Sequence, residues 1–153
     1  MKGQGYCELQ VDLSSGLKIS KAIGNIADDC GGAIPANKLH ATIMYDVRNP
    51  DIFPPKSNAV YNAKVIGIKT LGKPGDKWYA CALELNCPEI HARHKELVKA
   101  GYVHSYDDLL LHVSLSYGEA TSVIAPQLEQ MFAEGKLPET ITLCNETWDT
   151  LED

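Results

Sequence analysis

Alternating apolar and polar residues predict strands along much of the chain. In residues 5–12 every second side chain is apolar, which is the pattern of a strand with one buried face. The sequence contains five further β-rich runs, over residues 39–45, 61–71, 77–86, 109–117 and 139–147. The turn residues Gly72-Lys73-Pro74-Gly75-Asp76 join the third and fourth of these six runs, so we expect a hairpin there.

Three stretches have helical spacing instead. The first contains Leu17 and Ile26 and should end at Gly31-Gly32, the second runs from Pro88 to about Ala100, and the third covers residues 121–134. Strands and helices in this order indicate an α+β fold. A chain of 153 residues can bury about two-thirds of its unfolded surface. We therefore expect one domain over residues 1–153.

One short pattern occurs twice. Its copies are Leu39-His40-Ala41-Thr42-Ile43-Met44-Tyr45 and Leu111-His112-Val113-Ser114-Leu115-Ser116-Tyr117. Because strand side chains alternate, His40 and Thr42 should share one face. By the same argument His112, Ser114 and Ser116 should share a face of the second strand. A single triplet of this kind is common by chance and is usually structural, whereas two copies in similar strands indicate a catalytic pair.

Two histidines and two hydroxyls suit attack at a phosphodiester. One imidazole can deprotonate the nucleophile and the other can protonate the leaving oxygen, since the unperturbed pKa of histidine is about 6.5. Hydroxyls can donate hydrogen bonds to the phosphoryl oxygens as charge builds up there. This scheme requires no metal and no cofactor. The candidate catalytic residues are therefore His40, Thr42, His112 and Ser114.

The paired motifs resemble the signature of the two-histidine phosphoesterase superfamily. Within it, residues from about Tyr6 to Trp148 most resemble the anti-CBASS phosphodiesterases of tailed bacteriophages. This resemblance implies two pseudo-symmetric lobes whose antiparallel sheets form a V-shaped cleft, with the helices outside. It also implies hydrolysis of the cyclic di- and trinucleotides, such as cGAMP, that serve as alarm signals in bacterial CBASS defence. The alternatives are an RNA 2′,3′-cyclic or 2′-5′ phosphodiesterase acting on linear ends, and a non-catalytic cyclic-nucleotide sponge.

Aromatic side chains are candidates for binding the substrate bases. Tyr6 and Trp78 could each stack on a base, or could be an ordinary strand tyrosine and a buried tryptophan. Glu146 and Trp148 lie two residues apart near the end of the last predicted strand. Trp148 could stack on a base while the Glu146 carboxylate accepts a hydrogen bond from a base or sugar, or both could belong to a solvated tail. The proline-rich loop over residues 46–56 could be a lid or a plain surface excursion.

The net charge, the cysteines and the absence of long apolar runs limit the possible ligands, metals and location of the protein. A net charge of −6 makes long RNA or DNA a poor partner and favours a small nucleotide. Cys87, His91 and His94 have the spacing of metal ligands on a helix, but no fourth ligand is evident, so we expect no metal there. The five cysteines lack a C-x-x-C pair and are expected to be buried thiols. We find no membrane-spanning run or signal-peptide pattern, and expect the protein in the cytosol, that of a host bacterium if it is phage-encoded.

Overall fold

A single antiparallel sheet forms the centre of the fold. The computed structural model describes residues 3–30, 34–106 and 109–152, and within them the sheet has six strands in the order β2-β1-β6-β3-β4-β5. The strands are β1 (Tyr6–Val11), β2 (His40–Tyr45), β3 (Tyr61–Leu71), β4 (Ala80–Asn86), β5 (His112–Tyr117) and β6 (Thr140–Asp149). The two motif strands, β2 and β5, thus lie at opposite ends of the strand order.

Three α-helices accompany the sheet in the described residues. They are α1 (Leu13–Cys30), α2 (Pro88–Ala100) and α3 (Thr121–Ala133), and a short 3-10 helix, η1 (Ala36–Lys38), precedes β2. The predicted α+β class and the six strands are confirmed. Helix α1 starts directly after β1 and contains Leu17 and Ile26 as expected, and its predicted stop at Gly31-Gly32 lies outside the described residues. Pro88 opens α2 as expected, and Gly101 ends it with a φ of 120° that favours glycine.

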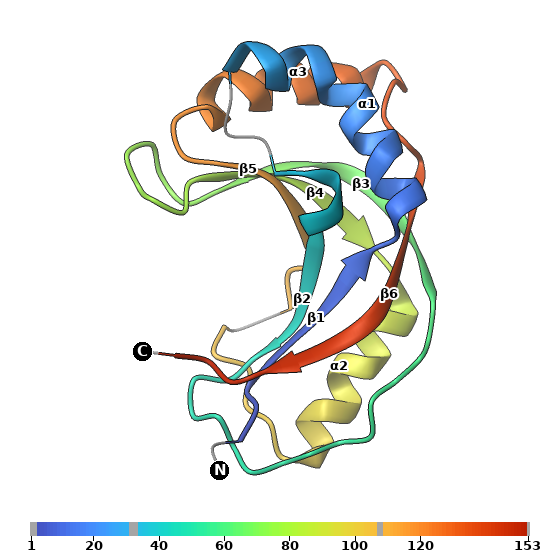
Figure 1. Ribbon diagram of the computed structural model, residues 1–153, viewed down its shortest axis with the longest axis vertical. Helices are drawn as coiled ribbons and strands as arrows, with labels where there is room; N and C mark the ends of the chain where they lie inside the picture. Colours follow the sequence, from blue (N-terminus) through green and yellow to red (C-terminus); the bar gives the residue numbers. More distant parts are fainter. Residues whose placement is uncertain (1–2, 31–33, 107–108, 153) are drawn as a thin grey trace.

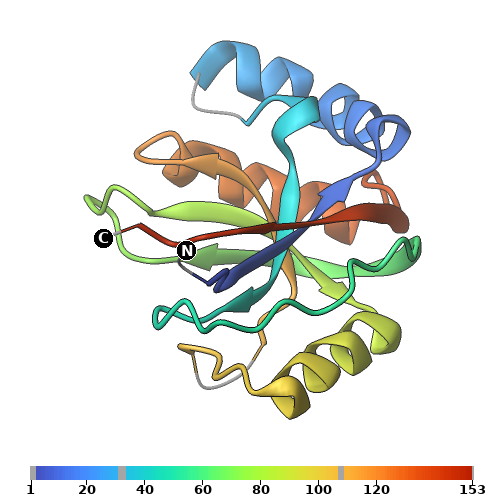
Figure 2. The ribbon, with the colours of Figure 1, turned by 60° about the horizontal axis from the view of Figure 1, so that its bottom comes forward.

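The sheet is strongly curved. Figure 1 shows the strands bending around one side while α1, α3 and α2 lie on the outside. Because of this curvature β2 and β5 come into contact, although four strands separate them in the sheet. In Figure 2 the β2 strand crosses close to β5 near the middle of the molecule. The two motif strands are therefore brought together by the bend of the whole sheet.

The apolar face of each strand forms one continuous core with the helices. In β1 the buried side chains are Cys7, Leu9 and Val11, and the alternate ones are more exposed, as the sequence pattern predicts. Helices α1, α2 and α3 contribute buried isoleucines and leucines to the same cluster. Consequently the opposite face of the sheet, which carries the polar half of each strand, is left without a helix over it (Figure 1).

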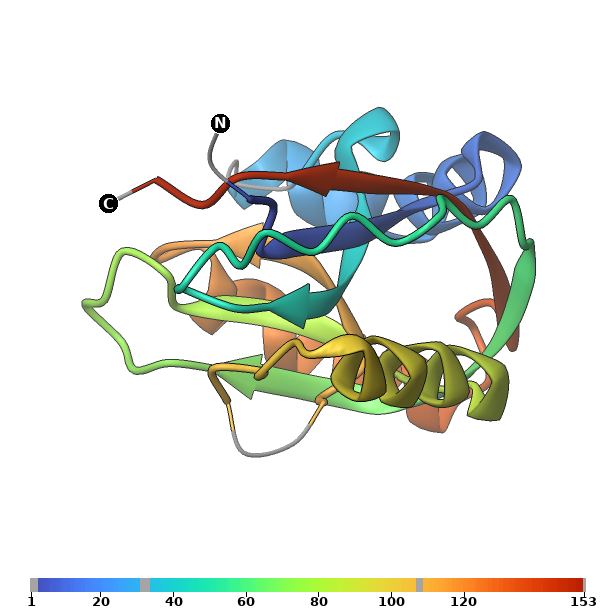
Figure 3. The ribbon, with the colours of Figure 1, turned by 90° about the horizontal axis from the view of Figure 1, so that it is seen from below.

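The proline-rich segment after β2 lies beside α2. In Figure 2 residues 46–60 run between the strands and that helix, and in Figure 3 the segment crosses in front of β1. The carbonyl of Pro55 accepts a hydrogen bond from Arg93 of α2 at 3.2 Å, and the carbonyl of Ile52 accepts one from the Tyr102 hydroxyl at 2.9 Å. These bonds attach the segment to the helix-covered side of the sheet. They favour an ordinary surface loop over a lid that closes on the substrate. None of the helices described is long and apolar enough to cross a membrane.

Candidate active site

The two motif histidines are held in the same way. His40 and His112 are the first residues of β2 and β5, and each ring bonds through Nδ1 to the carbonyl two residues earlier. The distances are 3.0 Å from His40 to the Lys38 oxygen and 2.8 Å from His112 to the Leu110 oxygen. A carbonyl only accepts, so Nδ1 carries the proton in both rings and each Nε2 is left for another partner.

A β-bulge follows the hydroxyl residue in each motif strand. Met44 lies opposite Cys7 and Thr42 lies opposite Glu8, so Ile43 is one residue too many for the pairing. In the same manner Ser116 pairs with Cys81 and Ser114 with Ala82, which makes Leu115 the extra residue. A bulge shifts the alternation of all side chains beyond it.

The bulges decide which side chains join the histidine face. Tyr45 and Tyr117 return to that face, whereas Ser116 turns into the core and bonds to the Thr121 hydroxyl at 2.9 Å. The expectation that Ser116 shares a face with His112 is therefore wrong, because it assumed an unbroken alternation. The tyrosines were missed for the same reason, although their recurrence at the end of both motifs was a usable signal.

The two hydroxyls have different surroundings. Thr42 Oγ1 lies 3.1 Å from the Tyr6 hydroxyl, which comes from the neighbouring strand β1. Ser114 is 9% exposed and lies opposite Ala82 of β4. Burial raises the pKa of Tyr6 to about 12, so its hydroxyl stays protonated and can donate a hydrogen bond at neutral pH.

Electrostatics distinguish the two histidines. Burial lowers the pKa of His112; the hydrogen bond to Leu110 opposes this, and positive charge on His40 and Lys69 lowers the pKa further. The two rings are carried by strands β2 and β5, which are in contact. The Glu8 carboxylate lies 4.0 Å from His40 Nδ1.

Aromatic rings lie beside both motif strands. Trp78, which is 64% exposed just before β4, packs edge-on against Tyr117 of β5 with ring centres 5.5 Å apart. Tyr6 packs edge-on against Tyr45 at 6.2 Å. The structure therefore brings the predicted residues Tyr6 and Trp78 to the same side as the four motif residues.

Glu146 and Trp148 lie on the opposite, helix-covered side of the sheet. Around Asn145, whose φ is 56°, β6 has one residue more than β1 between Cys144 and Thr147, and this bulge turns Glu146 and Trp148 away from the histidine face. The Glu146 carboxylate, which is 1% exposed, accepts bonds from Arg93 at 2.8 and 2.9 Å and from Trp148 Nε1 at 3.1 Å. The Trp148 ring stacks on Tyr102 at 5.3 Å. Both side chains therefore have structural partners within the protein.

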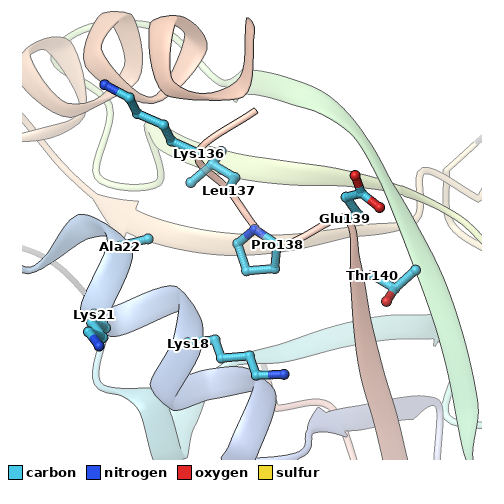
Figure 4. A pocket seen from close by; sticks show the side chains of 8 residues that line it. All are labelled: Lys18, Lys21, Ala22, Lys136, Leu137, Pro138, Glu139 and Thr140. Atoms are coloured by element: carbon cyan, nitrogen blue, oxygen red, sulfur yellow. The ribbon is translucent and has the colours of Figure 1, made fainter. Parts of the chain in front are cut away.

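A cavity lies away from the histidine face. It measures about 660 Å³ and lies between α1 and the segment that leads from α3 into β6. Lys18, Lys21 and Lys136 line it, but Figure 4 shows that their amino groups do not converge on a common point. We therefore assign the candidate active site to the histidine face, on the chemistry of its side chains.

The helix group with metal-ligand spacing is engaged by the protein itself. The Cys87 thiol donates to Glu89 at 3.3 Å, and His94 Nδ1 lies 2.7 Å from the Ile43 carbonyl. In the part of the chain that the structure describes, no three His, Cys, Asp or Glu side chains gather as a metal site would need. Cys7, Cys81 and Cys87 are buried free thiols, and Cys144 is a half-buried one.

Two comparisons with known proteins bear on this site. The sequence model of a family described as anti-CBASS protein Acb1 matches residues 16–152, which include both histidine motifs. The anti-CBASS protein Acb1 of Vibrio phage KVP40 is 31% identical to this chain over 90 residues. That alignment covers 59% of this chain and 56% of the phage protein.

Proposed function

Since the chain belongs to the anti-CBASS protein Acb1 family, we propose that it hydrolyses the 3′-5′ linkages of cyclic di- and trinucleotides and so counters CBASS defence. The observation that carries this proposal is the identical seating of His40 and His112, which leaves two Nε2 atoms free on contacting strands. A phosphodiester held between them has an acid on one side and a base on the other. The net charge of −6 favours such a compact ligand over a long nucleic acid.

The first step would be attack by a ribose 2′-hydroxyl on the adjacent phosphorus. One histidine takes the 2′ proton as the new P–O bond forms, and the other protonates the 5′ oxygen as its bond to phosphorus breaks. The product is a 2′,3′-cyclic phosphate with a free 5′-hydroxyl. Water then opens the cyclic phosphate, and the two histidines exchange their roles as acid and base.

The hydroxyls stabilise the charge that develops on the phosphoryl group. Thr42 and Ser114 follow the two histidines by two residues and share their face, so both can donate to the non-bridging oxygens. Tyr6 would support Thr42 through the 3.1 Å contact between their hydroxyls. In this scheme the side chains provide all the acid, base and hydrogen-bond groups, so the reaction is metal-independent.

The proposed domain consists of two pseudo-symmetric lobes over residues 1–153. One lobe would contain β2, β1 and β6 and the other β5, β4 and β3, with a V-shaped cleft along the histidine face. Two features support this arrangement: the strand order places the motif strands at equivalent ends, and the bulges occupy equivalent positions. Tyr6 and Trp78, each in contact with a motif tyrosine, would stack on the bases.

We assign the first general base to His112 and the acid to His40. The lowered pKa of His112 favours an unprotonated Nε2, as a base needs, and the acid role then falls to the other motif histidine, His40. A general base must be unprotonated to accept a proton, so a lower pKa keeps the enzyme active at lower pH. We therefore expect the midpoint of the acid limb of kcat/KM to lie below pH ~6.5, the ordinary pKa of histidine.

Lys69→Met provides the check on that assignment. Removing the positive charge should raise the pKa of His112 and move the acid limb of kcat/KM to higher pH. Lys95→Met, on the outer helix α2, removes the same charge far from the histidine face and should leave the limb in place. The assignment fails if the limb does not move in Lys69→Met, or if both variants shift it equally.

The substrate class is tested by chromatography of the products. Purified protein is incubated with 3′-5′ cyclic di- and trinucleotides and, separately, with linear RNA ending in a 2′,3′-cyclic phosphate and with 2′-5′-linked RNA. We expect the cyclic oligonucleotides to be opened at an unchanged rate in excess EDTA. Consumption of the linear substrates alone would establish the RNA-processing alternative, and loss of activity in EDTA would contradict a metal-independent reaction.

A further inference from the structure

Strand β2 lies at the end of the sheet, and its outer edge is covered by side chains and loop backbone. Among the described strands only β1 pairs with it. On the other edge His94 Nδ1 bonds to the Ile43 carbonyl at 2.7 Å, and the Tyr45 amide donates to His104 Nδ1 at 3.1 Å. The Ser105 amide donates to the Tyr45 carbonyl at 2.7 Å. Three consecutive edge groups are thus held from α2 and the segment after it.

The two histidines of this edge have opposite tautomers. His94 faces a carbonyl, so its Nδ1 must carry a proton, whereas His104 faces an amide N–H, so its Nδ1 must be bare. Their rings meet edge-on with centres 4.9 Å apart. His104 therefore fills its place only as a neutral ring.

The charges around His104 favour that neutral state. Burial lowers its pKa and so does His94 from α2, while Asp46, just after β2, acts in the opposite direction. The ring of Tyr106 lies 5.7 Å from that of His104 and also packs against the ring of Tyr45. Asp46 itself is tied to Arg48 at 2.7 Å and to the Val103 amide at 2.8 Å, which reduces its pull on a proton at His104.

These contacts fall on the bulge of β2. Ile43 is the extra residue of that bulge, and Tyr45 follows Met44, the residue at which pairing with β1 resumes. If the strand slipped by one residue, every side chain of β2 would turn to the other face. The bonds to His94 and His104 oppose that slip from the side where β2 has no partner strand.

We propose that His94 and His104 are positioning residues that lock the bulged register of β2 and so aim Thr42 and His40 at the phosphodiester. We call the hydrogen bonds from His94 to the Ile43 carbonyl and from the Tyr45 amide to His104 the clamp. Its effect on turnover rests on the proposed function, but the clamp itself exists in the protein without substrate. Neither ring lies among the reacting groups, and both act through the backbone of Ile43 and Tyr45.

The test compares His104→Leu with His104→Asn. Leucine removes the acceptor, whereas the Asn Oδ1 lies close to the position of Nδ1 and can accept from the Tyr45 amide. Because a misplacement of about 1 Å can cost 10²-fold, we expect His104→Leu to lower kcat by ~10–100-fold with little change in KM. His104→Asn should recover most of the loss, and His91→Leu, the same change at a histidine of α2, should resemble the parent protein.

A second pair keeps the test valid if His104→Leu does not fold. His94→Leu removes the donor to Ile43, and His94→Asn restores one through Nδ2, so the same loss and recovery of kcat are expected. Equal kcat in the leucine and asparagine variants at either position, with circular dichroism showing that both fold, would overturn the proposal.

Hydrogen exchange at the Tyr45 amide separates this inference from the proposed function. We expect faster exchange in His104→Leu than in His104→Asn or His91→Leu, whatever the substrate is. If the parent protein cleaves no cyclic nucleotide but the exchange pattern is found, the proposed function fails and the clamp stands. If exchange is the same in all three variants, the clamp fails even where the parent protein is active.

Discussion

Alanine at His40 or at His112 is expected to lower kcat for cyclic dinucleotides by about 10²–10⁴-fold. Each substitution removes one of the two proton-transfer groups, and neither histidine can replace the other because each Nε2 serves a different oxygen. The two groups act as a unit, so kcat of the double variant should be little lower than kcat of the less active single variant. Product chromatography under single-turnover conditions measures the effect.

Ligand binding provides the control for these variants. Calorimetric titration with a cyclic dinucleotide should show that the double alanine variant still binds, since the hydroxyls and aromatic rings of the histidine face remain. His91→Ala, on α2, should turn over substrate like the parent protein. If the double variant depleted the nucleotide in cells as well as the parent does, the protein would be a sponge rather than an enzyme.

Arg93→Met is expected to cause the largest loss of stability, about 3–5 kcal/mol in the free energy of unfolding. Arg93 is 14% exposed and binds both oxygens of the Glu146 carboxylate, which is 1% exposed. Burial alone would raise the pKa of Glu146, but the bonds from Arg93, the Ser57 amide and Trp148 hold the pKa below its usual value. Without Arg93 a buried carboxylate loses its only cationic partner among the contacts described. Urea unfolding followed by circular dichroism measures the loss.

Two further variants isolate the cause. Glu96→Gln removes the second carboxylate that binds Arg93, an exposed one, and should cost less than about 1 kcal/mol. Arg93→Met combined with Glu146→Leu removes both charges and should be more stable than Arg93→Met alone. An Arg93→Met protein that unfolds at the same urea concentration as Glu96→Gln would contradict the account of this ion pair.

The local pattern of the sequence was sufficient for the elements and the motif residues. Alternation in residues 5–12 identified β1 and its buried face, and the proline and glycine around α2 marked both of its ends. The repeated histidine–hydroxyl pattern identified the two strands that carry the candidate catalytic groups. These features depend on neighbours within a few residues, so a single chain displays them directly.

The local sequence pattern could not show on which face of the sheet the predicted substrate-binding residues Glu146 and Trp148 lie. A tryptophan two residues from a glutamate near the end of a strand looks the same on either face. The bulge at Asn145 decided the matter for Glu146 and Trp148, and Arg93, 53 residues away, then took the carboxylate. The sequence contained the members of this group but nothing that paired them.

By itself, then, the sequence determined an α+β chain with two histidine–hydroxyl strands and a helix bounded by Pro88 and Gly101. The tertiary structure alone decided that β2 and β5 touch, that Tyr45 and Tyr117 share a face of the sheet with the motif histidines, and that Glu146 and Ser116 face the core. The physical reason is that side-chain direction along a strand is local only until a bulge, and a bulge is a mismatch between two strands. Its position is set by pairing with a distant segment, which no single stretch of residues records.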